Sequence, residues 1–233
     1  MSIEELYDRW HRDKYQDAGQ LAPTAPWHLM ARKHIREDSL HGQDVLEIGC
    51  GPGQFALWLA EQGGNVIAGD FSAEACRIAR KIGGDKVDVR QLDAQHLVEP
   101  LGRETFDLVV CLETLEHVPD HDKALKEIVA VTKPGGRIVV STPNYLGFMG
   151  VYRVLLRLGG RRYTEVGQPV NNVMVGAMRT IKLKRLDCRI DAVEGRVHHM
   201  PVPGMSRQIR FPFMERPAFR YVARHVLVVA TKR

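Results

Sequence analysis

One segment, residues 45–70, constrains the fold of this chain more than any other. It reads V-L-E-I-G-C-G-P-G-Q-F-A-L-W-L-A-E-Q-G-G-N-V-I-A-G-D. It describes an apolar strand, a turn with three glycines (Gly49, Gly51 and Gly53), an amphipathic helix and a second apolar strand that ends at Asp70. A helix between two short apolar strands forms a βαβ unit, whose strands lie parallel in one sheet. The segment therefore predicts an α/β protein with the glycine turn at the carboxyl end of its first strand.

The spacing of these glycines excludes two common nucleotide-binding loops. A dinucleotide fingerprint needs a third glycine where this chain has Gln54, and a P-loop needs a G-K-[ST] that is absent after the turn. The turn still lets the backbone approach a ligand, and the next helix points its N–H groups at that ligand. Asp70 can accept hydrogen bonds from ribose hydroxyls, while Glu47 can face a cationic group. These residues predict a nucleoside ligand that is cationic and has no phosphate.

Five segments occur in a characteristic order between about residues 40 and 145. V-L-E-I-G-C-G-P-G and G-D-F-S come first, followed by V-R-Q-L-D-A at 89–94. The series ends with a strand and its loop L-E-T-L-E-H-V at 106–118, followed by a K-P-G-G turn and its strand at 132–144. The series resembles class I S-adenosylmethionine-dependent methyltransferases, of the ubiquinone, menaquinone and sugar O-methyltransferase group. S-adenosylmethionine carries an ammonium, a sulfonium and a ribose but no phosphate, in agreement with the ligand inferred above.

The resemblance implies which residues hold the cofactor, S-adenosyl-L-methionine. Glu47 and the glycine turn would hold the methionine end, and Asp70 would bind the ribose. Asp93 and the backbone N–H of Ala94 would bind the adenine edge, while backbone carbonyls at 111–112 would face the ammonium. The implied cofactor-binding residues are Glu47, Gly49, Cys50, Gly51, Gly53, Asp70, Phe71, Asp93, Ala94, Cys111 and Leu112.

Short apolar strands alternate with helices along the chain, which predicts parallel strands joined by right-handed crossovers. The last strand is expected to run antiparallel beside its predecessor. Strands are predicted at 45–48, 66–69, 87–92, 108–111, 138–141, 188–197 and 221–231, and helices at 2–14, 27–35, 54–62, 73–82, 121–131, 145–162 and 178–186. We predict a doubly wound, mostly parallel seven-stranded sheet with helices on both faces, an antiparallel last strand and an N-terminal helical lid.

The chain is long enough for one α/β domain with added segments. We predict an N-terminal helical lid at 1–40 and an S-adenosylmethionine-binding core at 41–145. Residues 146–233 would supply acceptor-binding insertions and the C-terminal strands of the same domain. The ligand is expected outside the carboxyl ends of the strands.

Two residues after the fourth predicted strand are candidates for catalysis. Methyl transfer to a hydroxyl needs alignment, desolvation and removal of a proton. His117 follows the carboxyl end of that strand, and its ordinary pKa near ~6.5 suits a base at neutral pH. Alternatively, His117 only orients the loop and Glu113, because similar loops occur in family members whose acceptor needs no base. Glu113 is the alternative acid or base.

The two parts of the chain differ in charge. Residues 151–233 hold 17 Lys/Arg and 5 Asp/Glu, a net +12, whereas residues 1–150 carry −7. A basic half predicts an anionic partner such as a phosphate, a nucleic acid or a membrane surface, although a solvated arginine-rich face is equally compatible. Arginines suit phosphate or carboxylate, and the Met, Phe and Tyr residues of 145–219 suit an apolar chain. The predicted acceptor-binding residues are Asn144, Tyr145, Arg153 and Tyr163, with Trp10 and His11 from the lid.

Composition favours a cytoplasmic protein, with peripheral contact to a membrane as an additional expectation. No apolar run approaches the ~20 residues of a membrane span, and the N-terminus lacks a signal-peptide pattern. The four cysteines form no C-x-x-C pair, which favours reduced thiols and argues against zinc. His198 and His199 are adjacent, and adjacent residues on a strand point to opposite faces, so two ligands on one ion are not expected. We therefore predict no metal site.

The sequence as a whole favours an O-methyltransferase. The acceptor would be a small or lipid-linked anionic metabolite such as a quinone, sugar or natural-product intermediate. A hydroxyl acceptor is favoured because the fourth-strand loop resembles that of quinone and sugar O-methyltransferases and no N-P-P-[YF] signature is present. Two alternatives are an RNA methyltransferase that uses the basic half, and a non-catalytic cofactor-binding partner subunit. The oligomeric state stays open.

Overall fold

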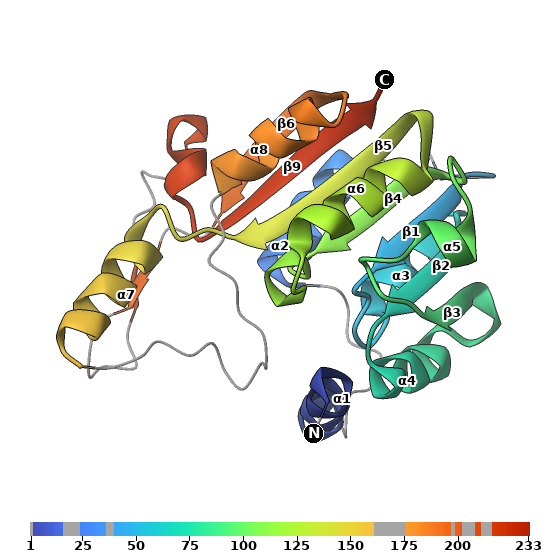
Figure 1. Ribbon diagram of the computed structural model, residues 1–233, viewed down its shortest axis with the longest axis horizontal. Coiled ribbons are helices and arrows are strands. Elements are labelled where there is room, and N and C mark those ends of the chain that lie inside the picture. Colours follow the sequence, from blue (N-terminus) through green and yellow to red (C-terminus); the bar gives the residue numbers. More distant parts are fainter. Residues whose placement is uncertain are drawn as a thin grey trace.

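A seven-stranded sheet forms the centre of the molecule, with strand order β3-β2-β1-β4-β5-β9-β6 (Figure 1). The structure, a computed structural model, describes residues 2–15, 24–35, 40–160, 176–196, 199–201, 208–210 and 216–233. The strands are β1 (Asp44–Ile48), β2 (Asn65–Asp70), β3 (Val87–Gln91), β4 (Phe106–Leu112), β5 (Thr132–Pro143), β6 (Cys188–Arg196) and β9 (His225–Lys232). A separate two-stranded sheet pairs β7 (His199–Pro201) with β8 (Gln208–Arg210).

The direction of β9 decides which of its residues reaches the ligand side of the sheet. Strands β1 to β5 pair in parallel, whereas β9 is antiparallel to both β5 and β6. The predicted mostly parallel seven-stranded sheet is thereby confirmed. Because β9 runs the opposite way, its first residue, His225, lies opposite Pro143 at the end of β5. An antiparallel strand thus brings its N-terminal end to the edge where the parallel strands end.

Helices cover both faces of the sheet. One face carries α2 (Pro26–His34), α3 (Gln54–Glu61) and α4 (Ala73–Gly83), and the other carries α5 (Val98–Leu101), α6 (His121–Val131) and α8 (Gly176–Arg185). Two more helices are α1 (Ile3–Tyr15) and α7 (Phe148–Leu158), and short 3-10 turns are η2 (Gly84–Lys86), η3 (Leu115–His117) and η5 (Pro217–Val222). Within the described residues, no helix combines the length and apolarity that a membrane crossing needs.

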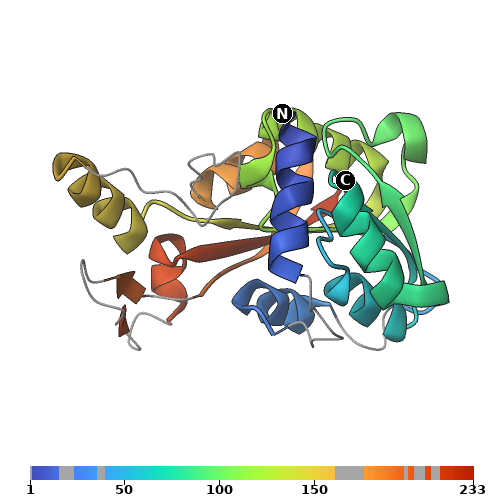
Figure 2. The same ribbon diagram turned by 90° about the horizontal axis from the view of Figure 1, so that it is seen from below.

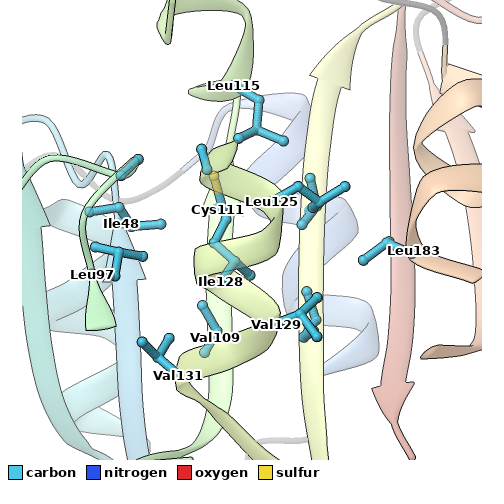
Figure 3. Packing of buried hydrophobic residues seen from close by; sticks show 14 of the residues in the cluster. Ile48, Leu97, Val109, Cys111, Leu115, Leu125, Ile128, Val129, Val131 and Leu183 are labelled. Atoms are coloured by element: carbon cyan, nitrogen blue, oxygen red, sulfur yellow. The ribbon is translucent and has the colours of Figure 1, made fainter. Parts of the chain in front are cut away.

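Alternating side chains of the central strands build two separate cores. In β4, Val109 and Cys111 face α6 and pack with Ile128, as Figure 3 shows. Leu108 and Val110 of the same strand join the core on the opposite face, beneath α3. Both sets are buried because the sheet is covered on both sides, which explains why β4 reads as a nearly continuous apolar run.

Helix α1 lies across the carboxyl edge of the sheet, next to α4 (Figure 2). Its Asp8 Oδ1 accepts hydrogen bonds from Ser72 Oγ at 2.5 Å and from the Glu74 backbone N–H at 3.1 Å. Glu4 Oε1 accepts a third bond from Gln91 Nε2 at 2.7 Å. A carboxylate at the N-terminus of α4 is favourable because the first N–H groups of a helix lack partners. These bonds hold the N-terminal helix over the edge where the sequence predicts a lid.

Helix α7 projects away from the sheet after β5 (Figures 1 and 2). Val151, Val154, Leu155 and Leu158 are exposed at spacings that place them on one helical face, and Leu158 is 80% exposed. Among the described elements, β7 lies next to α7. The helix therefore presents an apolar stripe to solvent.

Several predicted boundaries need correction. The last strand, predicted from residue 221, begins at His225, because residues 217–222 form the 3-10 turn η5. The fifth strand begins at Thr132 rather than at residue 138, because Thr132 already pairs with Phe106 before a register shift. The helix predicted over 145–162 begins at Phe148 and ends at Leu158. The short elements α5, β7, β8 and the 3-10 turns were not predicted, since each has too few residues for a period. The loop predicted at 161–169 lies outside the described residues.

Candidate active site

A cavity of about 710 Å³ opens at the carboxyl edge of the sheet. Its volume lies within the range of about 300–1,000 Å³ that is usual for ligand pockets. The loops after β1, β2 and β3 form one end of the cavity, and the ends of β4 and β5, the start of β9 and helix α2 form the other. We call these the carboxylate end (Glu47, Asp70 and Asp93) and the histidine end (His28, Glu113, Arg224 and His225). Side chains of α1 complete the wall.

Two glycines of the turn after β1 lie very close to neighbouring residues. Gly49 has a φ of 77°, and a Cβ there would lie 2.1 Å from Thr114 Oγ1. Gly53 has a φ of 82°, and a Cβ there would lie 2.8 Å from the Cβ of Ala79 in α4. Gly49 and Gly51 line the cavity, whereas Gly53 does not. Gly53 instead allows the start of α3 to pack on α4, which differs from the cofactor contact predicted for it.

Asp70 joins the two loops at the carboxylate end. Its Oδ2 accepts a hydrogen bond from the Gly51 backbone N–H, and its Oδ1 accepts one from the Ser72 backbone N–H, both at 2.9 Å. The residue is buried and lines the cavity. Each carboxylate oxygen has a further lone pair, so Asp70 can still accept hydrogen bonds from hydroxyl groups of a ligand.

Glu47 is a buried carboxyl group with an open acceptor position. It lines the cavity, it is 3% exposed, and its Oε2 has no hydrogen-bond partner among the described residues. Burial and the neighbouring Asp70 charge raise the pKa of Glu47 well above its ordinary value, while a backbone hydrogen bond from Ala56 opposes the rise. A cationic ligand group would complete this site, because it supplies both the missing donor and the missing positive charge.

Asp93, after β3, is held by its own loop. Its Oδ1 accepts hydrogen bonds from the backbone N–H and side-chain amide of Gln95 at 2.9 and 3.1 Å, and His96 Nδ1 lies 3.1 Å from Oδ2. Partial burial raises the pKa of Asp93, but these hydrogen bonds outweigh it, so the pKa falls below its ordinary value. Asp93 and the adjacent Ala94 both line the cavity, as does Leu92 before them.

Glu113 organises the histidine end. Its φ is 51°, in the left-handed region that residues other than glycine rarely adopt. Its Oε1 accepts a hydrogen bond from Ser141 Oγ at 2.9 Å, and its Oε2 lies 2.7 Å from His225 Nδ1. The backbone N–H of Glu113 also donates to the Ser141 carbonyl at 3.1 Å. Backbone conformation and hydrogen bonds together fix the carboxylate between β5 and β9.

Two aromatic residues of α2 complete this end. The Trp27 ring lies 5.2 Å from the ring of His225, and His28 stacks on Phe55 at 5.0 Å. Burial lowers the pKa of His28 to about 4, although the Glu113 charge acts in the opposite direction. His28 is therefore neutral near pH 7, and its buried Nδ1 has no hydrogen-bond partner among the described residues.

The lid supplies further predicted residues to the cavity. Trp10 and His11 of α1 line it, together with Tyr7. The ring of His117 lies edge-on to Tyr7 at 6.3 Å, and His117 Nε2 is 3.5 Å from Glu116 Oε1. His117 thus belongs to the cavity wall between the lid and η3. The structure also brings the predicted Cys50, Phe71 and Leu112 to the cavity.

Four predicted site residues lie elsewhere. Cys111 is fully buried in the core beneath α6, because it points to the opposite face of β4 from Leu112. Asn144 Nδ2 donates to the carbonyls of Tyr221 at 2.7 Å and Ala223 at 2.9 Å, which ties the end of β5 to η5. The remaining two are Tyr145 and Arg153, which pack on each other with the guanidinium 4.5 Å from the ring centre.

These positions correct the predicted acceptor set. Asn144, Tyr145 and Arg153 do not line the cavity, because hydrogen bonding and packing use their side chains at the base of α7. Tyr163 lies outside the described residues.

Several cavity residues were missed by sequence reasoning. Trp27 and His28 lie in a predicted helix, Pro143 follows the strand predicted at 138–141, and Arg224 and His225 lie within the strand predicted at 221–231. For Trp27 and His28 of α2, the only sequence signal for a place in the site was that they directly follow Pro26. No local pattern marks His225, because its role depends on where β9 pairs.

The family model for a methyltransferase domain matches residues 46–140. A ubiquinone biosynthesis O-methyltransferase of Aliivibrio fischeri is 33% identical over 147 residues, which are 61% of this chain and 61% of that protein. The chain therefore aligns with less than two thirds of the length of this curated relative. Solved structures of S-adenosylmethionine-dependent methyltransferases share the fold. The alignment with one from Thermotoga maritima (TM-score 0.64, 22% identity) covers 98% of this chain and 96% of that chain. The alignment with one from Mesorhizobium loti (TM-score 0.63, 20% identity) covers 89% of this chain and 99% of that chain.

The carboxylate end fits the cofactor of this family. Glu47 offers a buried, unsatisfied oxygen for an ammonium group, and Asp70 offers acceptor positions for ribose hydroxyls. Asp93 and Ala94, the predicted adenine contacts, line the cavity past the end of β3. S-adenosylmethionine is the cofactor that this domain implies, and none of these residues conflicts with it. Residues 46–140 of this chain match a methyltransferase domain, in agreement with the resemblance to class I S-adenosylmethionine-dependent methyltransferases seen in the sequence.

Proposed function

We propose that this chain transfers a methyl group from S-adenosylmethionine to a hydroxyl group of a small or lipid-linked anionic acceptor. The observation that supports this most is the two-ended cavity. One end carries carboxylates suited to a cationic nucleoside, and the other carries a glutamate and imidazoles suited to a hydroxyl proton. The similarity to ubiquinone biosynthesis O-methyltransferases favours an oxygen acceptor.

The residues of the carboxylate end would bind and orient the donor. Glu47 would pair with the ammonium, Asp70 would accept hydrogen bonds from the ribose, and Asp93 with the Ala94 N–H would bind the adenine. When bound, S-adenosylmethionine supplies an electrophilic methyl group on its sulfonium. Trp10, His11 and Tyr7 of α1 cover the cavity and would exclude water from it.

The residues of the histidine end would bind the acceptor and take its proton. Glu113 and His117, the catalytic candidates from the sequence, both line the cavity. Trp27 and Pro143 offer apolar contacts to a ring, and Arg224 offers positive charge to an anionic group. A hydroxyl needs a base within hydrogen-bond reach as its oxygen attacks, and this end has such groups.

We propose in addition that α7 contacts an anionic membrane surface and so reaches a lipid-linked acceptor. The exposed apolar stripe of α7 is accompanied by Arg153 and Arg157, and the helix has no acidic residue. A helix with these properties favours the lipid interface. Vesicles containing phosphatidylglycerol should bind the protein in a flotation assay, and Leu155→Glu with Leu158→Glu should abolish the binding. Equal binding to purely zwitterionic vesicles would contradict the charge-based part of this proposal.

A direct assay tests the proposed reaction. The protein is incubated with labelled S-adenosylmethionine and either a prenylated catechol that carries a carboxylate group or total RNA, and products are examined by mass spectrometry. We expect one added CH₂ on the catechol and none on RNA. Asp70→Asn should abolish transfer and donor binding, while Asp88→Asn, an exposed aspartate outside the cavity, should change neither. Label on RNA alone would favour the RNA methyltransferase, and donor binding without transfer to either probe would favour the non-catalytic alternative.

A further inference from the structure

We infer that His225 is the general base of the proposed reaction and that Glu113 is the residue that positions it. The inference rests on the proposed function and deepens it, because neither the family motifs nor the sequence pattern assigns a role to His225. The two residues are 112 positions apart, and His225 stands at the start of β9, outside the matched family domain.

The pair is built as a fixed unit. Glu113 Oε2 lies 2.7 Å from His225 Nδ1, and the other carboxylate oxygen accepts the Ser141 hydroxyl at 2.9 Å. Both side chains are largely buried, at 13% and 9% exposure. The left-handed backbone at Glu113 is locally unfavourable, and these contacts offset that cost. Strain of this kind concentrates where a side chain must be aimed at a particular place.

The geometry also fixes which tautomer the neutral His225 ring adopts. A carboxylate accepts hydrogen bonds only, so His225 Nδ1 must be the donor in this pair. The neutral ring then carries its lone pair on Nε2, the other nitrogen. His225 lines the cavity, and Nε2 has no hydrogen-bond partner among the described residues. An imidazole that lines the cavity and is held through its other nitrogen by a carboxylate is the arrangement of a general base.

The other imidazoles of the cavity are less suited to this role. His28 has a pKa of about 4 because of burial, so it is a weak proton acceptor at neutral pH. His117 Nε2 lies 3.5 Å from Glu116 Oε1, and its ring rests against Tyr7 of the lid. A hydroxyl would have to compete with those contacts. His225 has the Trp27 ring beside it, which holds the imidazole without occupying Nε2.

The proposed step balances. The acceptor hydroxyl gives its proton to His225 Nε2, and the electron pair of its oxygen forms the new O–CH₃ bond. The pair from the broken S–CH₃ bond stays on sulfur, so the sulfonium becomes a neutral thioether. The imidazolium formed on His225 is stabilised by the Glu113 carboxylate until it loses the proton to solvent.

Three variants and a control test the inference. His225→Ala, His225→Gln and Glu113→Gln change the pair, and His41→Gln changes an exposed histidine outside the cavity. Proton NMR of the ligand-free protein should show a strongly downfield imidazole proton in the wild type and in His41→Gln. That resonance should vanish in the other three variants. Its absence from the wild type would overturn the pair without any assay of activity.

Kinetics with the prenylated catechol test the role. Each change to the pair should lower kcat by ~10²-fold or more, with donor affinity by calorimetry changed by less than ~3-fold. Added imidazole should restore part of the activity of His225→Ala. The double variant Glu113→Gln/His225→Gln should be no slower than His225→Gln alone, because the residues act as one unit.

Two outcomes separate this inference from the proposed function. If the wild type methylates the catechol and His225→Gln does so at the same rate, the inference is overturned and the proposed function stands. No transfer by the wild type to the catechol would overturn the proposed function and, with it, the role of base. Loss of activity in His225→Ala without rescue by imidazole, together with weakened donor binding, would reduce His225 to a structural residue.

Discussion

The two ends of the cavity are built in different ways. The carboxylate end is made by turns that directly follow β1, β2 and β3, and its polar groups bond mainly to backbone N–H groups of the same turns. The histidine end is assembled from α2, β4, β5 and β9, and its central contact joins residues 113 and 225 through side chains. The carboxylate end is formed by local turns that recur after successive parallel strands. The histidine end forms only when elements distant in the sequence have packed together.

This difference predicts how each end responds to change. Local turns are sensitive to backbone substitutions, whereas an assembled site is sensitive to charge and protonation. The four predictions below test that contrast, from the largest expected effect to the smallest.

Gly49→Val should be the most damaging change at the carboxylate end. The new Cβ would meet Thr114 Oγ1 at 2.1 Å, and the φ of 77° is unfavourable for a β-branched residue. We expect a loss of about 4 kcal/mol in the free energy of unfolding, measured with urea, and loss of donor binding. Gly51→Ala is the matched control, since a Cβ there meets nothing within 4 Å and should cost only about 1 kcal/mol. Equal losses would show that sterics at Thr114 are unimportant.

His28 should make the histidine end sensitive to acid. Its pKa of about 4 lies below its ordinary 6.5, so the folded state binds fewer protons than the unfolded state between these values. Stability should therefore fall as the pH drops from 6.5 to about 4, by on the order of 3 kcal/mol. His28→Phe should remove this part of the pH dependence in urea titrations, and exposed His41→Phe should not. An unchanged slope in His28→Phe would contradict the lowered pKa.

Glu47→Gln should separate donor binding from stability. The amide keeps the shape of the side chain but loses the charge that would pair with an ammonium, so donor affinity should fall by about 2 kcal/mol. The raised pKa makes the folded state keep a proton that the unfolded state releases above about pH 4.5, so this carboxyl lowers stability as pH rises. The ligand-free variant should therefore be more stable than the wild type at pH 8 by calorimetry. Weaker binding with lower stability would assign Glu47 a structural role instead.

Asp8→Ala should loosen the lid with the smallest effect. The change removes the acceptor of Ser72 Oγ and of the Glu74 N–H, at a cost of about 1 kcal/mol. Hydrogen exchange should become faster in α1 and stay unchanged in α3. Asp13→Ala, an exposed aspartate of the same helix, is the control. Unchanged exchange in α1 would show that apolar contacts alone hold the lid.

Residues of the carboxylate end could be predicted because their chemistry follows from position in a motif. Glu47, Asp70 and Asp93 each stand within or just after an apolar strand, and parallel strands end at one edge. Gly53 and Cys111 show the limit of this reasoning. Each lies in a motif, yet Gly53 packs on α4, where the absence of a Cβ allows the close approach. The side chain of Cys111 faces the core because alternate residues of a strand point to opposite faces, whereas its predicted contact was through the backbone carbonyl.

The acceptor side was harder to predict for a physical reason. Asn144, Tyr145 and Arg153 follow the fifth strand and are polar or aromatic, which makes them reasonable candidates from sequence. In the structure their side chains satisfy backbone carbonyls of η5 and one another. Whether a polar side chain turns to a ligand or to its own chain depends on partners that lie far away in sequence.

The sequence by itself determined the order of strands and helices in the parallel half and the carboxylate end, because hydrophobic period and turn chemistry are local properties. The sequence also predicted an antiparallel last strand, but only the tertiary structure decided that β9 lies between β5 and β6 and begins at the ligand edge. That pairing sets His225 beside Glu113. No local pattern encodes such a contact, because it arises from the burial of whole strands against both of their neighbours.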